Sequence, residues 1–335
     1  MSKEQFKLTK WDKNPILKPT GKGYWERVAV LNPGAYYDNG IVYLLYRASG
    51  EFDDYRIYFG LAISKDGYHF ERVSDEPVFS PSLDGFDAGA VEDPRIVKFG
   101  DTFYITYACR RYPPGPVHRK EKVKYQGKTR AEIENLTRSG LLRSKDLHSF
   151  ERLGPITPSD IDDRDVILFP EKIGGKYVML HRPAEWIGKK YGCEKPSVWL
   201  AYSDDLLHWK DDFLLFKGEQ DWESGKVGGS APPIKTEKGW LLIYHGTDKN
   251  NVYRAGVMML DLNNPQKIIA RSPNYILEPE TKFEREGFVN NVVFPTGNIV
   301  IGDTLFVYYG GADTVCCVAT TKLKDIIDYV MQFAI

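Results

Sequence analysis

The chain has 335 residues, of which 42% are hydrophobic, so it is long enough to bury a sizeable core. Its 45 basic residues almost cancel its 46 acidic residues, and the formal net charge of -1 gives no reason to expect nucleic acid or an anionic membrane as a partner. The N-terminal segment has no apolar signal-like region and no stretch is long enough to cross a bilayer, so we expect a cytoplasmic protein.

A hairpin pattern recurs five times along the chain. Each copy starts at a proline, alternates in polarity, turns at a pair of residues that includes glycine, and continues into an aromatic-rich strand. In chain order the copies are NPGAYYDNGIVYLLYRA (32–48), DPRIVKFGDTFYITYAC (93–109), FPEKIGGKYVMLHRP (169–183), PPIKTEKGWLLIYHG (232–246) and FPTGNIVIGDTLFVYYGG (294–311). A second strand pair follows each copy. The pairs at 60–73, 140–153 and 199–212 share a Ser-Lys-Asp or Ser-Asp-Asp turn, and those at 255–268 and 315–328 are weaker versions.

The spacing of these copies predicts an all-β fold, a five-bladed β-propeller that forms a single domain over residues 1–335. The last aromatic-type position of each hairpin falls at intervals of 61, 74, 63 and 65 residues, at Tyr46, Tyr107, His181, Tyr244 and Tyr309. A four-stranded unit repeated at that spacing is typical of a propeller. The longest interval holds a charged insertion at 110–137, which would suit a lid or a homo-oligomer contact. Helix is expected only near 130–137 and in the C-terminal tail, LKDIIDYVMQFAI.

The hairpins also predict a polar pocket at one rim of the propeller. The strands of a hairpin run antiparallel, so the start of the first strand and the end of the second lie at the same rim. The starts contribute Asn32, Asp93, Arg95 and Glu171, and the ends contribute Arg47, Arg182, His245 and Asp313. Each residue alone could be structural, but their convergence favours a binding site for a carbohydrate and an anion. Glu92 is expected to face away from Asp93 and to be structural, because side chains alternate along a strand.

The composition suits a sugar-binding protein without a metal. Aromatic residues make up 13% of the chain, with 21 Tyr and 7 Trp, and their flat faces stack well on pyranose rings. The 4 cysteines have no metal-ligand or disulfide spacing, and the histidines are scattered. We therefore expect reduced cysteines, no metal and no cofactor.

Several of these segments together resemble the inverting β-mannoside phosphorylases of glycoside hydrolase family 130. The matching segments are NPGAYYDNGIVYLLYRA, AVEDPRI, FPEKIGGKYVMLHRP, SGKVGGSAPPIKTEKGWLLIYHG and VYYGGADT. They run from about residue 25 to residue 315, so the resemblance covers nearly the whole chain. None of these motifs is specific alone, but EDPR followed by HRP and IYHG is a specific combination.

The resemblance implies a role for each candidate residue. Asp93 would be the general acid, passing its proton to the glycosidic oxygen through a sugar hydroxyl. Inorganic phosphate, the co-substrate, would be bound by Arg164, Arg182, Lys226 and His245. The mannosyl unit would contact Asn32, Arg47, Arg95 and Asp313, and the product would be α-mannose 1-phosphate. Lys226 is expected in a glycine-rich loop, SGKVGGS.

The same fold is also compatible with two alternative functions. An inverting β-mannosidase would need a second carboxylate to activate water, and Glu171, Glu185 and Glu223 are candidates for that base. A non-catalytic sugar-binding propeller would be expected to lack the acid. A phosphorylase needs no base, because phosphate is already an anion, but it needs fixed cations. The retained cations and Asp93 therefore favour phosphorolysis, while linkage and acceptor sugar stay open.

Overall fold

The computed structural model describes residues 5–335, and almost all of its regular structure is antiparallel strand. This confirms the expected all-β class. Helix is confined to short elements, which are α1 (Gly115–His118), α2 (Arg130–Glu134), η1 (Asp221–Glu223), α3 (Lys282–Arg285), α4 (Leu323–Val330) and η2 (Met331–Phe333). Within residues 5–335, none of these helices has the length and apolar character needed to span a membrane.

The first two hairpin repeats form one large sheet. It consists of two antiparallel groups that are joined by a single parallel residue pair, Ile57 with Ala90. Its strands are β2 (Ala29–Asp38), β3 (Ile41–Ser49), β4 (Ile57–Ser64), β5 (Glu71–Arg72), β6 (Ala90–Phe99), β7 (Thr102–Arg110), β8 (Arg138–Ser144) and β9 (Glu151–Pro155).

Three smaller antiparallel sheets complete the fold. One contains β10 (Asp163–Leu168), β11 (Tyr177–Pro183), β12 (Val198–Ser203) and β13 (Trp209–Phe216). The next contains β14 (Lys226–Gly229), β15 (Ile234–Thr236), β16 (Gly239–Thr247), β17 (Tyr253–Leu260) and β18 (Ile268–Arg271). The last contains β19 (Val293–Ile301), β20 (Thr304–Gly311), β21 (Val315–Lys322) and β1 (Thr9–Lys10).

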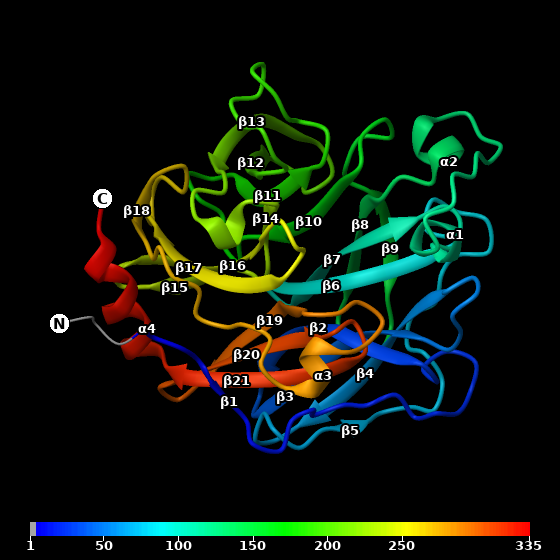
Figure 1. Cartoon of the computed structure of the whole chain (residues 1–335), viewed down its shortest axis with the longest axis horizontal. Helices are drawn as coiled ribbons and strands as arrows, with labels where there is room; N and C mark the ends of the chain where they lie inside the picture. Colours follow the sequence, from blue (N-terminus) through cyan, green and yellow to red (C-terminus); the bar gives the residue numbers. More distant parts are fainter. Residues whose placement is uncertain (1–4) are drawn as a thin grey trace.

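The last sheet takes its outer strand from the other end of the chain. A strand pair was expected at 315–328, but only β21 forms there, and it leads directly into α4. The outer position is filled by β1, in which Thr9 pairs with Thr320. Figure 1 shows α4 and the N-terminal segment together at one edge of the molecule. The expected C-terminal helix is confirmed.

Two inner strands begin earlier than the sequence pattern indicated. β10 ends at Leu168, before Pro170, and pairs with β11 from Asp163 opposite Pro183. The segment SGKVGGS is not a loop, because β14 runs through it and pairs Lys226 with Thr247. In both repeats the proline follows the inner strand instead of starting it, so proline was a misleading marker of the strand start.

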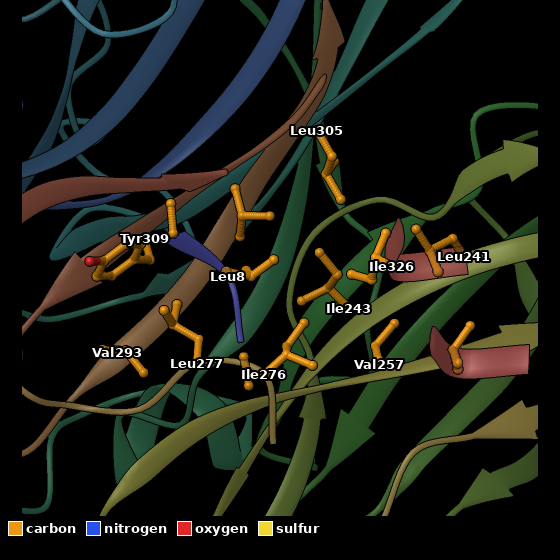
Figure 2. Close-up of a cluster of buried hydrophobic side chains, with 14 of the residues drawn as sticks. Leu8, Leu241, Ile243, Val257, Ile276, Leu277, Val293, Leu305, Tyr309 and Ile326 are labelled. Carbon is orange, nitrogen blue, oxygen red and sulfur yellow. The ribbon is translucent and has the colours of Figure 1, made fainter. Parts of the chain in front are cut away.

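A buried apolar cluster joins the last two sheets to the C-terminal helix (Figure 2). Leu241, Ile243 and Val257 come from β16 and β17, and Leu305 comes from β20. Ile326 of α4 packs into the same cluster, which explains why the helix lies against the sheet edges. Alternating side chains along each strand supply this face, as expected for half-buried sheets.

The charged insertion is anchored to the strand that precedes it. Thr129 and Glu132 form a capping box at the start of α2, and Asn135 ends the helix with a φ of 52°. The Asn135 side chain accepts from the Tyr112 backbone N–H and donates to the Tyr112 carbonyl. The Arg110 guanidinium donates to the Asn135 carbonyl at 2.6 Å. The insertion is thereby tied to the end of β7.

Candidate active site

The same backbone irregularity occurs in three inner strands. Asn32, Asp93 and Asp165 have φ values of 46°, 52° and 55°, and at each of them the pairing with the next strand shifts register. Asn and Asp tolerate this left-handed conformation better than most other residues. All three side chains line a single cavity. The three bulges therefore aim equivalent polar residues from three different repeats at one site.

The cavity brings together most of the residues that the sequence analysis selected. Eight of the nine candidates line it, namely Asn32, Arg47, Asp93, Arg164, Arg182, Lys226, His245 and Asp313. Arg95 lies directly behind them. Its guanidinium donates to the backbone carbonyls of Asp93, at 2.7 Å, and of Ser230, at 3.1 Å. The convergence of sequence-distant strand ends is thus present, while the role of each residue remains a prediction.

Asp93 is fixed by two donors on one of its carboxylate oxygens. Oδ1 accepts a hydrogen bond from Asn32 Nδ2 at 2.8 Å and from Arg47 Nη1 at 3.0 Å. Oδ2 accepts none from the residues that the structure describes, and the carboxylate lines the cavity. One oxygen therefore sets the orientation of the carboxyl group, and the other is available for a substrate.

Glu92 also faces the cavity, contrary to the expectation that it would point away. Its carboxylate lies 3.1 Å from Arg47 Nη1 and 3.5 Å from Arg110 Nε. The left-handed φ of Asp93 breaks the alternation of the strand, so neighbouring side chains share one side. Burial alone would raise the pKa of Glu92, but Arg47 and Arg110 outweigh it and hold the pKa below its usual range.

A third carboxyl group, that of Asp313, titrates near neutral pH. Its pKa is raised to about 6, mainly by burial and also by the negative charges of Asp93 and Glu92. Arg47 and Lys226 oppose the shift without cancelling it. The cavity therefore holds a carboxyl group that can donate as well as accept a hydrogen bond at mildly acidic pH.

Another wall of the cavity is rich in cations. Arg182 Nε lies 2.6 Å from Asp165 Oδ2, so this carboxylate orients the guanidinium. Lys226 Nζ donates to the Tyr253 hydroxyl at 2.6 Å. Burial is the main cause that lowers the pKa of Lys226 to about 7, and the nearby Arg182 and Arg164 contribute to the same shift. Positively charged side chains held in this way suit an anion such as phosphate.

His245 completes this wall as a neutral ring. Burial is the main cause that lowers its pKa to about 3, and the Asp165 carboxylate only partly opposes it. A Cβ atom on Gly228 would lie 2.3 Å from His245 Cε1 and 2.4 Å from Asp165 Oδ2. Glycine at this position of β14 therefore allows the backbone to approach the ring and the carboxylate closely.

The three glutamates considered as a hydrolytic base lie outside the residues that line the cavity. Glu171 is exposed and pairs with Lys235, and Glu185 pairs with Arg130 of the insertion. Glu223 is buried, where it accepts a hydrogen bond from the Tyr244 hydroxyl at 2.6 Å. The expected place of Glu171 at the pocket rim is wrong, because β10 ends at Leu168 and Glu171 falls in the connection that follows.

Sequence reasoning missed several residues of the cavity. They are Arg110, His118, Thr137, Asp165 and Tyr253. Arg110 is the last residue of β7, and Arg182 similarly lies near the end of β11. A search for arginines at strand ends could therefore have found Arg110. Asp165 was missed because the inner strand of its repeat was placed too late. His118 comes from the insertion, where no repeat pattern exists to place it.

Buried His181, which precedes Arg182 in β11, forms an ionic triad with buried Asp163 and with Asp212, which is exposed. His181 Nδ1 lies 2.8 Å from Asp163 Oδ2, and its Nε2 lies 3.1 Å from Asp212 Oδ1. Burial alone would lower the pKa of His181, but Asp163 and Asp212 outweigh it and raise the pKa from 6.5 to about 9. The charged imidazolium is therefore the form that the fold favours at neutral pH.

The His181 triad predicts a pH-dependent stability. Because the pKa of His181 is higher in the folded state than in the unfolded state, protonated His181 stabilises the fold. This stabilisation is complete below pH 6.5 and is lost as the pH rises towards 9. We expect the free energy of unfolding to fall by about 3 kcal/mol across that interval because of this group. Denaturant unfolding at several pH values measures the effect, and His181→Gln should flatten the profile. An equally steep decline in the variant would contradict this assignment.

The chain matches a known protein family over most of its length. Residues 13–332 match a family model described as "beta-1,4-mannooligosaccharide phosphorylase". The chain is thus a carbohydrate-active enzyme of the all-β class. It belongs to glycoside hydrolase family 130.

Two curated relatives span nearly the full length of the chain. A 1,2-beta-oligomannan phosphorylase of Thermoanaerobacter sp. (strain X514) is 43% identical over 327 residues, which cover 96% of this chain and 99% of the relative. A beta-1,2-mannobiose phosphorylase of the same organism is 38% identical over 333 residues, with coverage of 96% and 99%. A beta-1,4-mannooligosaccharide phosphorylase of Ruminococcus albus is 32% identical over 276 residues, covering 80% of this chain and 74% of the relative.

The fold is also that of solved structures in the family. The complex of the beta-1,2-mannobiose phosphorylase from Listeria innocua with beta-1,2-mannobiose aligns with a TM-score of 0.80 and 29% identity, covering 96% of this chain and 99% of the other. A second solved structure aligns with a TM-score of 0.77 and 24% identity. Its description states that the family of mannoside phosphorylases contains glycoside hydrolases that target beta-1,2 mannosidic linkages. The second likeness concerns the fold alone.

Proposed function

We propose that the chain is an inverting β-mannoside phosphorylase, which cleaves a β-mannoside with inorganic phosphate and releases α-mannose 1-phosphate. The observation that carries this proposal is the composition of the cavity. It combines Asp93, whose Oδ2 is available, with a wall of cations, whereas Glu171, Glu185 and Glu223 lie elsewhere. An anionic nucleophile needs such cations and no general base. The names of the relatives support the same reaction.

The site residues take the following proposed roles. Asp93 donates the proton to the leaving oxygen, and Arg164, Arg182, Lys226 and His245 bind phosphate. Asn32, Arg47 and Asp313 bind the mannosyl unit. Arg95 was expected to contact the sugar, but its hydrogen bonds to the Asp93 and Ser230 carbonyls favour a positioning role behind Asp93.

The proposed reaction needs only the mannoside, phosphate and the side chains named above. A phosphate oxygen attacks the anomeric carbon from the face opposite to the leaving group, and the bond from that carbon to the glycosidic oxygen breaks. The Asp93 proton passes to the glycosidic oxygen, through a sugar hydroxyl as the family resemblance implies. The cations stabilise the attacking anion throughout. No cofactor takes part in this scheme.

We further propose that the substrate is β-1,2-linked. The relatives with 43% and 38% identity are named for β-1,2-linked mannosides, whereas the relative named for β-1,4-linked mannooligosaccharides is 32% identical. The solved Listeria innocua complex, with its β-1,2-linked ligand, covers almost the same length. The linkage thus follows the relatives with the higher identity.

The proposed architecture is a five-bladed propeller with the cavity on its axis. The large sheet counts as two blades, since only Ile57 and Ala90 pair across its middle. Contacts between inner strands support a ring. They join β2 to β6, β6 to β10, β10 to β14 and β19 to β2, and the remaining step is made by β16, the neighbour of β14, which contacts β19. The four free cysteines favour a reducing compartment such as the cytoplasm. Self-association through the insertion remains a proposal.

Incubation of the protein with β-1,2-mannobiose, with and without phosphate, tests the proposed function. We expect mannose 1-phosphate and mannose only when phosphate is present, and a lower rate with β-1,4-mannobiose. Release of free mannose without phosphate would support the hydrolase alternative. Binding of the disaccharide without any turnover would support the non-catalytic alternative.

A further inference from the structure

The aligned aromatic position of each hairpin repeat lies at the centre of a buried ion pair. In four repeats it is a tyrosine, whose hydroxyl donates to a carboxylate that comes before the inner strand. A cation from the outermost strand pairs with the same carboxylate, and we call this arrangement a latch. The four latches are Glu26–Tyr46–Arg72, Asp87–Tyr107–Arg152, Glu223–Tyr244–Arg271 and Glu284–Tyr309–Lys10.

The third repeat contains the same latch with its charges reversed. His181 takes the place of the tyrosine, and Asp163 supplies the carboxylate from β10. The outermost strand, β13, supplies a second carboxylate, Asp212, where the other repeats supply a cation. With His181 protonated, one positive and two negative charges give this latch a net charge of −1. The three members of each other latch sum to zero.

The residue that faces the central position also differs. Gly60, Gly140 and Gly256 pair with the tyrosines of three latches, and a Cβ atom there would lie only 2.2 to 2.5 Å from the tyrosine ring. Trp199 pairs with His181 instead. A tryptophan fits at this position because the central ring is the smaller imidazole. The reversal therefore involves the neighbouring strand as well as the latch itself.

The latches lie directly behind the cavity. In four of the five repeats the residue after the central position lines the cavity, and these residues are Arg47, Ala108, Arg182 and His245. Each latch connects the strand that carries this residue to the outer edge of its sheet. A hydrogen-bonded group of this kind fixes the strand end and with it the direction of the side chain that reaches the cavity.

The reversed latch supports the two arginines of the cationic wall. Asp163 Oδ1 accepts a hydrogen bond from the backbone N–H of Arg182 at 3.2 Å, and Asp163 immediately precedes Arg164. Arg164 and Arg182 lie opposite each other in the pairing of β10 with β11, and both line the cavity. Their positive charges repel each other and that of Lys226. A net negative charge behind the wall reduces this repulsion.

We propose that the latch Asp163–His181–Asp212 positions Arg164 and Arg182 for phosphate, so that its three members are positioning residues of the anion site. The proposal rests on the proposed function, which assigns phosphate to these arginines. All three members lie outside the residues that line the cavity.

The charge of His181 is held by its two carboxylates. Burial would lower the pKa of His181, but Asp163 of β10 and Asp212 of β13 raise it to about 9. Its other neighbours are uncharged, since Trp199 pairs with it from β12 and the Trp186 ring meets its edge. The latch therefore keeps its charges across the neutral range of pH.

The test measures the KM for phosphate in His181→Gln between pH 7 and pH 10. Glutamine can still donate to Asp163 but carries no charge. We expect the KM for phosphate to rise by about ten-fold at pH 7, because the arginines lose their fixed placement. The kcat at saturating phosphate and the KM for β-1,2-mannobiose should change little. The ratio of the variant KM to the wild-type KM should fall towards one above pH 9, where the wild type loses the same charge.

A second variant and a matched control separate positioning from stability. Asp212 is exposed, so Asp212→Asn should fold, and we expect it to raise the KM for phosphate by about three-fold, since solvent screens this pair. Asp212→Glu should retain the wild-type value. Tyr309→Phe removes the hydroxyl of another latch, and Gly310, which follows it, lies outside the residues that line the cavity. This control should lower the melting temperature and leave the KM for phosphate unchanged.

Three outcomes would overturn the positioning role. One is a KM for phosphate that stays unchanged in both His181→Gln and Asp212→Asn, with phosphorolysis intact, which would spare the proposed function. Another is a ratio for His181→Gln that stays constant up to pH 10. The third is an equal rise of this KM in Tyr309→Phe. A wild type whose turnover does not depend on phosphate would overturn the proposed function and the positioning role together.

Discussion

Replacement of Asp93 by asparagine is expected to reduce kcat for phosphorolysis by about 10³-fold, within the range typical of general acid catalysis. The asparagine side chain can keep its Oδ1 as acceptor for Asn32 and Arg47, so the geometry of the site should survive. The group that faces the substrate, however, becomes an amide that cannot transfer a proton at a useful rate. Initial rates and calorimetric binding of the disaccharide separate the two effects.

The control for this variant is another aspartate with a left-handed backbone. Asp211 has a φ of 62° and lies exposed in β13, outside the residues that line the cavity. Asp211→Asn tests whether the change of residue type at such a position is harmful in itself, and we expect it to retain full activity. Turnover in Asp93→Asn within ten-fold of the wild type would remove Asp93 from the proposed acid role.

Replacement of Lys226 by methionine is expected to raise the KM for phosphate by about 30-fold, the value of one hydrogen bond to a charged group. Methionine matches the length of the lysine stem and fills the space beside Tyr253, so the fold should tolerate it. The KM for the mannoside should change much less, because Lys226 lies on the cationic wall. Initial rates at varied phosphate and saturating mannoside measure both constants.

The same variant should lose part of the pH dependence of phosphate binding. The pKa of Lys226 lies at about 7, so the wild type loses this positive charge as the pH rises above 7. The ratio of the variant KM to the wild-type KM is therefore expected to be largest near pH 6 and to approach one near pH 9. Lys235→Met, in the exposed strand β15, serves as control. A ratio that stays constant with pH would contradict the assigned titration.

Local turn chemistry explains why much of the fold was predictable from the sequence. The hairpins at 32–48, 93–109 and 294–311 have tight turns with Asn-Gly or Gly-Asp, and each forms close to its predicted position. These turns fix the strand ends, and the strand ends bring Arg47, Asp93 and Asp313 into one cavity. Where the turn motif is strong, the sequence therefore predicts the strand ends and with them the residues of a site built from those ends.

The features that escaped prediction depend on backbone shape or on distant partners. Glu92 faces the cavity because Asp93 adopts a left-handed φ, which reverses the alternation that strand periodicity assumes. Asp165 is equivalent to Asp93, yet no proline follows it, so the hairpin of its repeat was placed too late. His118 reaches the site through ring contacts with Tyr55 and Phe288, which no short-range pattern encodes.

The pairing of β1 with β21 constrains how the chain can be assembled during synthesis. Thr9 leaves the ribosome long before its partner Thr320 is made. Leu8 must wait about as long for Leu305 and Ile326, which belong to the same apolar cluster. Closing so long a loop is entropically costly and kinetically late. The nascent N-terminal segment should therefore need shielding from misplaced pairing until the final strand emerges.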